Sequence, residues 1–150
     1  ILLALLIVPF TCHFKAQDID KIATCAGVVV GNASVDYILG DTQAFDDAIN
    51  IAYYSYLPSV MGASAILNYT EEERSFTSTI LSTNTDKVIM AYNNGAYDSN
   101  LYEEVVGCYR MLATVLLRPE IQADLKISKD QYDQIIATTS SNIRRIFDAM

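Results

Sequence analysis

The sequence predicts an all-α protein, a single-domain bundle of about five helices with one disulfide that joins the first helix to the fourth. Three observations lead to this prediction. Apolar residues recur at spacings of three and four along most of the chain, and alternating runs typical of strands are nearly absent. Capping residues, glycines and prolines divide this pattern into segments of helical length. Finally, Cys25 and Cys108 each fall on the apolar stripe of such a segment.

The chain opens on an apolar leader. Residues 1–10 are almost wholly apolar, and they give way through Lys15 to Ala16, a pattern that resembles the end of a signal peptide. This run is too short for a membrane-spanning helix, which needs about 20 apolar residues. We therefore expect a signal peptide over residues 1–16, truncated at its start, and a helical domain over 17–150. The expected location is periplasmic or secreted, with no stable membrane insertion once the leader is removed.

The first two helices are expected on either side of a glycine turn. Residues 19–39 carry apolar side chains on every side, which predicts a helix buried all round. Gly40 ends it, and Asp41 caps the next helix. That second helix is predicted over 42–57, because Pro58 should stop or kink it, with a further short helix after the proline.

The third helix is expected to begin at a capping box formed by Thr70 and Glu73. Its middle, residues 82–85, is Ser-Thr-Asn-Thr, a run of poor helix formers at which we expect the helix to be prone to break. The Asn-Asn-Gly run at 93–95 closes this helix.

Two further helices complete the expected bundle. Asp98 or Ser99 starts the fourth helix, whose apolar stripe reaches Leu116. After Pro119 and a short helical turn, a second capping box at Ser128 begins the last helix, which carries a one-sided apolar stripe toward the end of the sequence.

The charge of the chain argues against nucleic acid as a partner. The formal net charge is −8, from 18 acidic against 10 basic residues. Lysine and arginine are scattered singly, apart from Arg144 and Arg145, so there is no basic patch to neutralise phosphates.

The residue inventory also argues against most catalytic chemistry. The single histidine, His13, lies in the leader, so residues 17–150 lack the ligand sets of familiar metal sites and the base of nucleophilic triads. The adjacent acidic pairs at 46–47 and 103–104 point about 100° apart on a helix and cannot chelate one ion together. We expect no metal, no cofactor and no enzymatic activity, with a carboxylate-only hydrolase as the remaining catalytic alternative.

The two cysteines of the domain are expected to pair, because cysteines of exported proteins are oxidised to disulfides in the compartment that they enter. A Cys25–Cys108 disulfide would close a loop of about 80 residues and stabilise the fold by roughly 4 kcal/mol. Asp36 and Arg110 could form an ion pair beside it, although an exposed, solvated pair is the commoner outcome.

Small residues line one face of the first helix. Ala23, Gly27 and Gly31 recur every four residues, which makes a seam where another backbone can approach closely. Cys25 lies roughly opposite this seam. The first helix is therefore predicted to be central, with the fourth helix on its cysteine side and another against its glycines. Packing within the chain is the interpretation we favour, and a dimerisation face or a groove for a partner helix is the alternative.

The spacing Cys25-x-Gly27-x-x-x-Gly31 on a buried helix resembles a feature of small exported helical immunity proteins that neutralise cell-wall amidase toxins. The resemblance covers one helix. It implies a small exported helical protein that inhibits another protein, and it assigns no functional residue here.

Tyrosine is abundant, with ten in the chain. Its ring can be buried while its hydroxyl meets water or a partner, which suits an interface. Tyr53, Tyr54 and Tyr56 cannot all share one helix face, so at least one should be exposed, and this cluster beside Pro58 is the candidate contact surface.

Together these observations predict a non-enzymatic module that binds another protein, as an inhibitor or immunity protein does. A homodimer is an open alternative for the partner. The second alternative is a carrier or stress-protective binder of apolar ligands or clients, which would need an internal apolar cavity.

Overall fold

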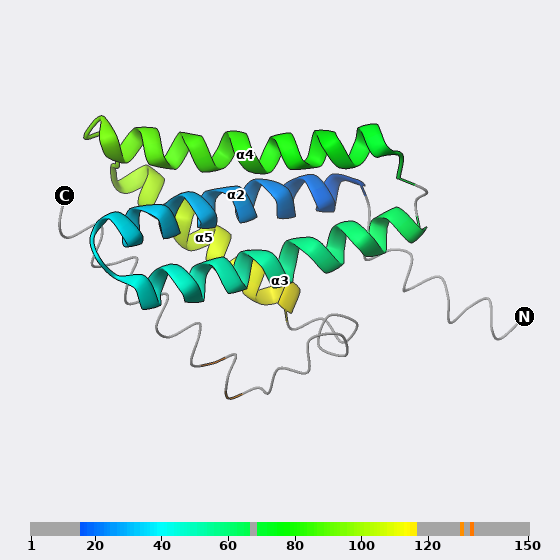
Figure 1. Cartoon of the computed structure of the whole chain (residues 1–150), viewed down its shortest axis with the longest axis horizontal. Coiled ribbons are helices and arrows are strands. Elements are labelled where there is room, and N and C mark those ends of the chain that lie inside the picture. Colours follow the sequence, from blue (N-terminus) through cyan, green and yellow to red (C-terminus); the bar gives the residue numbers. More distant parts are fainter. Residues whose placement is uncertain (1–15, 67–68, 117–129, 131–132, 134–150) are drawn as a thin grey trace, which may run out of the picture.

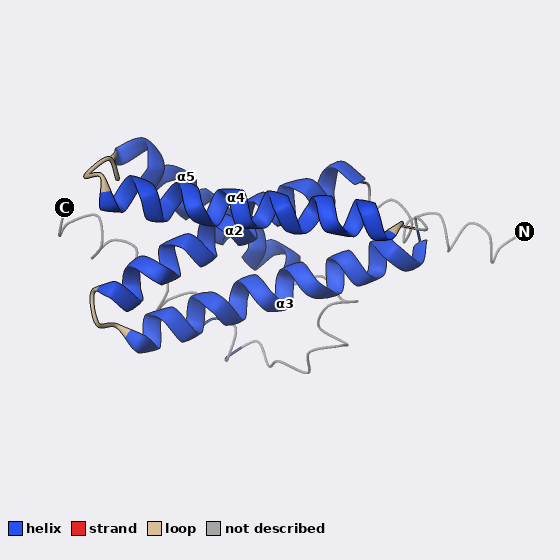
Figure 2. Cartoon of the chain, turned by 45° about the horizontal axis from the view of Figure 1, so that its top comes forward, coloured by secondary structure: helices blue, strands red, loops and turns tan. Residues whose placement is uncertain are grey.

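The computed structural model describes residues 16–66, 69–116, 130 and 133. It contains four helices in these residues: α2 (Ala16–Ile38), α3 (Thr42–Ile66), α4 (Glu71–Asn93) and α5 (Ser99–Leu116) (Figure 1). They are the first four helices of the expected bundle, and no strand occurs in the part of the chain described (Figure 2). The predicted all-α fold is confirmed. The predicted fifth helix, apart from Asp130 and Asp133, and all of the signal peptide except Ala16 lie outside the described residues.

The turn between α2 and α3 follows the local signals in the sequence. Gly40 has φ +87°, a left-handed conformation that favours glycine after a helix. Asp41 then caps α3, because its Oδ1 accepts a hydrogen bond of 2.9 Å from the backbone N–H of Ala44.

The prediction that Pro58 ends the second helix is wrong, since α3 runs through it to Ile66. A proline inside a helix cannot donate to the carbonyl four residues earlier. Buried contacts beside Pro58 hold this part of α3 in place. The Ser59 hydroxyl donates to the Ser55 carbonyl at 2.6 Å. The Ser55 hydroxyl donates to the carbonyls of Ile51, at 2.7 Å, and of Leu112 on α5, at 3.3 Å.

Helix α4 begins as predicted and does not break. The Thr70 and Glu73 capping box is complete, with both reciprocal hydrogen bonds present. Through residues 82–85 the helix is continuous, so the break that the sequence left open does not occur. The polar side chains there bond within the helix instead of opening it: Asn84 donates to the Ile80 carbonyl and Thr85 to the Leu81 carbonyl.

The ends of the α4–α5 connection also match the sequence signals. Gly95 has φ +68° just after the helix. The backbone N–H of Asn94 donates to the Met90 carbonyl of α4 and that of Gly95 to the Tyr92 carbonyl. Asp98 caps α5, since its Oδ1 accepts a hydrogen bond of 2.9 Å from the backbone N–H of Leu101.

Helix α2 is the centre of the bundle. It lies between α4 and α3 in Figure 1, with α5 crossing behind, and it packs against all three. The predicted disulfide is confirmed: Cys25 on α2 is bonded to Cys108 on α5, with their Cα atoms 4.7 Å apart. The largest fully buried side chains of the core are Ile19, Ile22, Val28, Val29, Val35, Ile51, Val88, Val105 and Leu112.

Candidate functional site

The small-residue face of α2 is covered by α4. A Cβ atom placed on Gly27 would overlap the carbonyl oxygen of Leu81 and lie 2.8 Å from Asn84 Cβ. One on Gly31 would lie 2.7 Å from both the Thr85 carbonyl oxygen and Val88 Cβ. Glycine is therefore required for this close approach, and the seam is filled by packing within the chain.

A hydrogen bond between the two helices fixes their register at this seam. The Thr85 hydroxyl donates to the Gly27 carbonyl of α2 at 3.1 Å, in addition to its bond within α4. Ala23, the first member of the seam, is fully buried. These contacts, from Leu81 to Val88, fix the middle and the C-terminal part of α4 against α2.

The three tyrosines predicted as a contact surface do not form one exposed patch. Tyr53 is 55% exposed, whereas Tyr54 and Tyr56 are partly buried and pack against the core. The rings of Tyr53 and Tyr54 meet edge to face at a centroid distance of 5.5 Å. Burial raises the pKa of Tyr56. Only Tyr53 offers a ring to a partner here.

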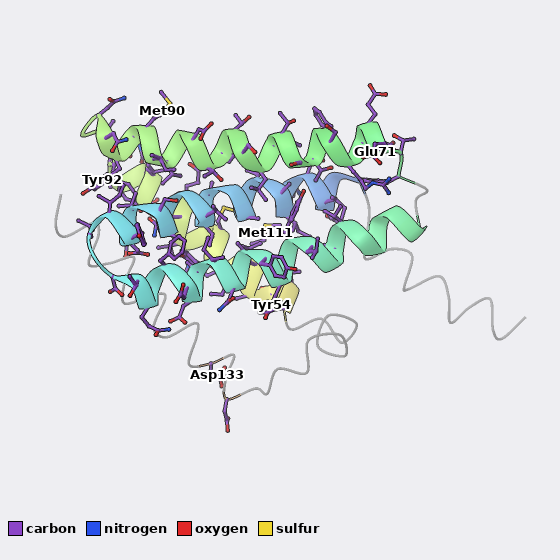
Figure 3. All side chains as sticks on the ribbon, in the orientation of Figure 1. Tyr54, Glu71, Met90, Tyr92, Met111 and Asp133 are labelled. Carbon is purple, nitrogen blue, oxygen red and sulfur yellow. A yellow bond between two sulfur atoms is a disulfide. The ribbon has the colours of Figure 1, made fainter. Side chains whose placement is uncertain are left out.

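A surface hollow at the start of α4 is the site that the sequence did not indicate. It has a volume of about 720 Å³ and is open to solvent. It lies where the first turns of α2, the segment before α4 and the first turns of α4 meet. Figure 3 shows Glu71 at this end of α4 and Met90 near the other end. The hollow is lined by Asp20, Tyr69, Thr70, Glu72, Glu73, Ser75, Phe76, Thr77 and Thr79.

The lining of this hollow is negatively charged. Among the described residues, it includes the carboxylates of Asp20, Glu72 and Glu73 and no lysine or arginine. The nearby guanidinium of Arg74 is bonded to Glu71 outside the lining, at 3.0 Å. Burial raises the pKa of Tyr69, which the carboxylates of Asp20 and Glu73 raise further, as expected beside negative charge.

The hollow also presents an aromatic surface. Phe76 is 60% exposed although its side chain is wholly apolar, and Tyr69 lies beside it in the same lining. Exposed phenylalanine next to a concave surface is typical of a binding site. The shape is open and the lining mixed, unlike the enclosed apolar cavity that a carrier of apolar ligands needs.

A buried polar cluster lies at the far end of α2. Asn32 and Asp36 lie one helical turn apart on α2, facing Tyr97 before α5 and Tyr109 on α5, and all four residues are at most 5% exposed. The Tyr97 hydroxyl donates to Asn32 Oδ1 at 2.6 Å. Because solvent is excluded, this cluster offers no accessible reactive group, and its Tyr97–Asn32 hydrogen bond joins α2 to the segment before α5.

Both tyrosines of this cluster have a pKa well above the ordinary value of a tyrosine hydroxyl. Burial is the main cause of the raised pKa of both Tyr97 and Tyr109, and the nearby Asp36 carboxylate adds to it. The unfolded chain therefore loses these protons near pH 10 while the folded protein keeps them. Their contribution to stability is complete below pH 10 and is lost as the pH rises above it.

We therefore expect the free energy of unfolding to fall above pH 10 by about 1.4 kcal/mol per pH unit for each tyrosine. Denaturant unfolding between pH 9 and 11 measures this slope. The Tyr97→Phe variant should show a shallower slope, whereas Tyr53→Phe, at an exposed position, should keep that of the parent. Equal slopes for all three proteins would contradict the assignment.

Two further properties hold for the described residues. No three His, Cys, Asp or Glu side chains come together there as a metal site would require. None of the four helices combines the length and apolar character of a membrane span.

The chain was compared with known proteins at three levels. No protein-family model, no curated protein sequence and no solved structure matches it.

Proposed function

We propose that this protein is a non-enzymatic module that binds another protein through the hollow at the start of α4. The observation that carries the proposal is the exposed ring of Phe76 in the lining of an open, acidic concavity. Aromatic residues supply large contact area at interfaces, and a side chain that fits into a hollow gives the shape complementarity that binding needs.

The proposed module acts outside the cytoplasm. The buried Cys25–Cys108 disulfide supports this location, since such bonds persist in oxidising compartments. The resemblance of the Cys25-x-Gly27-x-x-x-Gly31 pattern to exported immunity proteins agrees with an inhibitory kind of binding. In this proposal the partner's activity is changed by contact and the protein itself performs no reaction.

A matched pair of baits tests the proposed contact. Phe76 and Met90 are both 60% exposed on α4, but only Phe76 lines the hollow. We expect the parent protein and Met90→Ser to capture the same partner from the extracytoplasmic fraction of the producing cells. The Phe76→Ser bait should retain about tenfold less of it, the effect of losing an interface hot spot.

Quantitative mass spectrometry of the bound fraction measures this difference and also identifies a second copy of the chain if that is the partner. Equal capture by Phe76→Ser and the parent would contradict binding at the hollow. Circular dichroism of each bait confirms that the comparison is between folded proteins.

A further inference from the structure

Two carboxylates of the hollow have no hydrogen-bond or ion-pair partner within the described part of the chain. Asp20 on α2 and Glu72 on α4 both line it, and neither side chain forms a hydrogen bond or ion pair with another described residue. Glu73 differs, because it accepts the backbone N–H of Thr70 in the capping box. Two carboxylates from different helices are therefore available to one occupant.

The aromatic side chains beside these carboxylates restrict what that occupant can be. A cation with an apolar stem satisfies both kinds of surface, since its charge pairs with a carboxylate while its stem or its flat face packs on a ring. Arginine and lysine are such groups, and arginine also stacks on aromatic faces and binds carboxylates through two parallel hydrogen bonds. A bare metal ion would not use the exposed apolar ring of Phe76.

We propose that the hollow binds an arginine- or lysine-bearing segment of the partner protein, held between the Asp20 and Glu72 carboxylates and the ring of Phe76. This inference rests on the proposed function and names the partner's chemistry. Two observations of charge complementarity support this proposal. The lining of the hollow is acidic, and the chain as a whole carries a net charge of −8, so both attract a basic segment. The hollow of about 720 Å³ has room for a long side chain together with flanking backbone.

The test uses the full chain and two short peptides. One peptide carries arginines between glycines, and the matched peptide has glutamine in place of each arginine. We expect the arginine peptide alone to bind saturably in an NMR titration, with shifts centred on Tyr69, Phe76 and the first turns of α4. Added salt should weaken the binding, because the charges lie at the surface.

Charge-removing variants separate the hollow from the general acidity of the chain. Asp20→Asn and Glu72→Gln should each weaken the arginine peptide about fivefold, and Phe76→Ala should do so by a similar factor. Glu103→Gln is the matched control, since Glu103 is exposed on α5 and does not line the hollow. It makes the same change in net charge, and we expect no loss of affinity from it.

Three results would overturn the inference: no saturable binding, equal binding of the glutamine peptide, or the same loss from Glu103→Gln as from Glu72→Gln. The proposed function has a separate readout. If Phe76-dependent capture of a protein succeeds while the arginine peptide fails to bind, the proposed function is supported. The inference that a basic segment occupies the hollow is then wrong.

Discussion

Replacing Cys25 and Cys108 together by alanine should lower the free energy of unfolding by about 4 kcal/mol. The disulfide joins residues 83 positions apart, so it closes most of the described chain into a loop and restricts the unfolded ensemble strongly. This loss is comparable with the whole stability of many domains of this size, which is about 5–15 kcal/mol. The alanine variant should therefore be close to unfolding at physiological temperature.

Denaturant unfolding of the parent and the double variant measures this difference. Reduction of the parent under the same conditions should reproduce most of it without any change of side chain. Thiol labelling of the denatured, unreduced parent provides the control, because Cys25 and Cys108 should both be protected. Labelling at both cysteines, or a loss of stability below about 1 kcal/mol, would contradict the role of this bond.

Local chemistry explains why the boundaries of the helices could be predicted. The left-handed glycines at 40 and 95 and the caps at Asp41, Thr70 and Asp98 act within a few residues of their own positions. Each can therefore be found in a short window of sequence. The disulfide could also be predicted, because residues 17–150 contain only two cysteines and both fall on apolar stripes.

The continuity of α3 through Pro58 and of α4 through residues 82–85 has a different origin. Pro58 and the Ser-Thr-Asn-Thr run at 82–85 are unfavourable in an isolated helix, and propensity alone predicts an interruption at each. In the folded protein, contacts with another helix oppose the interruption at both places. Ser55 reaches the Leu112 carbonyl of α5, and Thr85 reaches the Gly27 carbonyl of α2. These partners are 57 and 58 residues away, so no local pattern reveals them.

The hollow and the buried polar cluster could not be predicted for the same reason. In the sequence, nothing distinguishes Asp20 and Glu72 from other acidic residues. They line one hollow only because α4 packs onto α2. The sequence allows an ion pair of Asp36 with Arg110 or an exposed, solvated position for both, whereas Asp36 is buried with two tyrosines and Arg110 is exposed. The sequence did contain one useful signal, since Asn32 and Asp36 lie four residues apart in the mostly apolar second half of this helix.

The glycine seam connects the fold to the proposed site, and it provides the second large effect. Gly27→Ala should lower the free energy of unfolding by about 1–2 kcal/mol. Overpacking costs about 1–3 kcal/mol, and here the added methyl group meets the backbone carbonyl of Leu81, which cannot move away by changing rotamer. The gain in helix propensity from glycine to alanine, about 1 kcal/mol, offsets only part of that cost.

Gly107→Ala is the matched control, because Gly107 is also inside a helix but a Cβ there has no neighbour within 4 Å. It should raise the free energy of unfolding by up to about 1 kcal/mol, so the two variants should shift the denaturant midpoint in opposite directions. Stabilisation by both would show that α4 does not press on α2. The seam also holds Glu72 and Phe76 on α4 beside Asp20 on α2. Gly27→Ala should therefore weaken the arginine peptide even in molecules that remain folded, although residue 27 does not line the hollow.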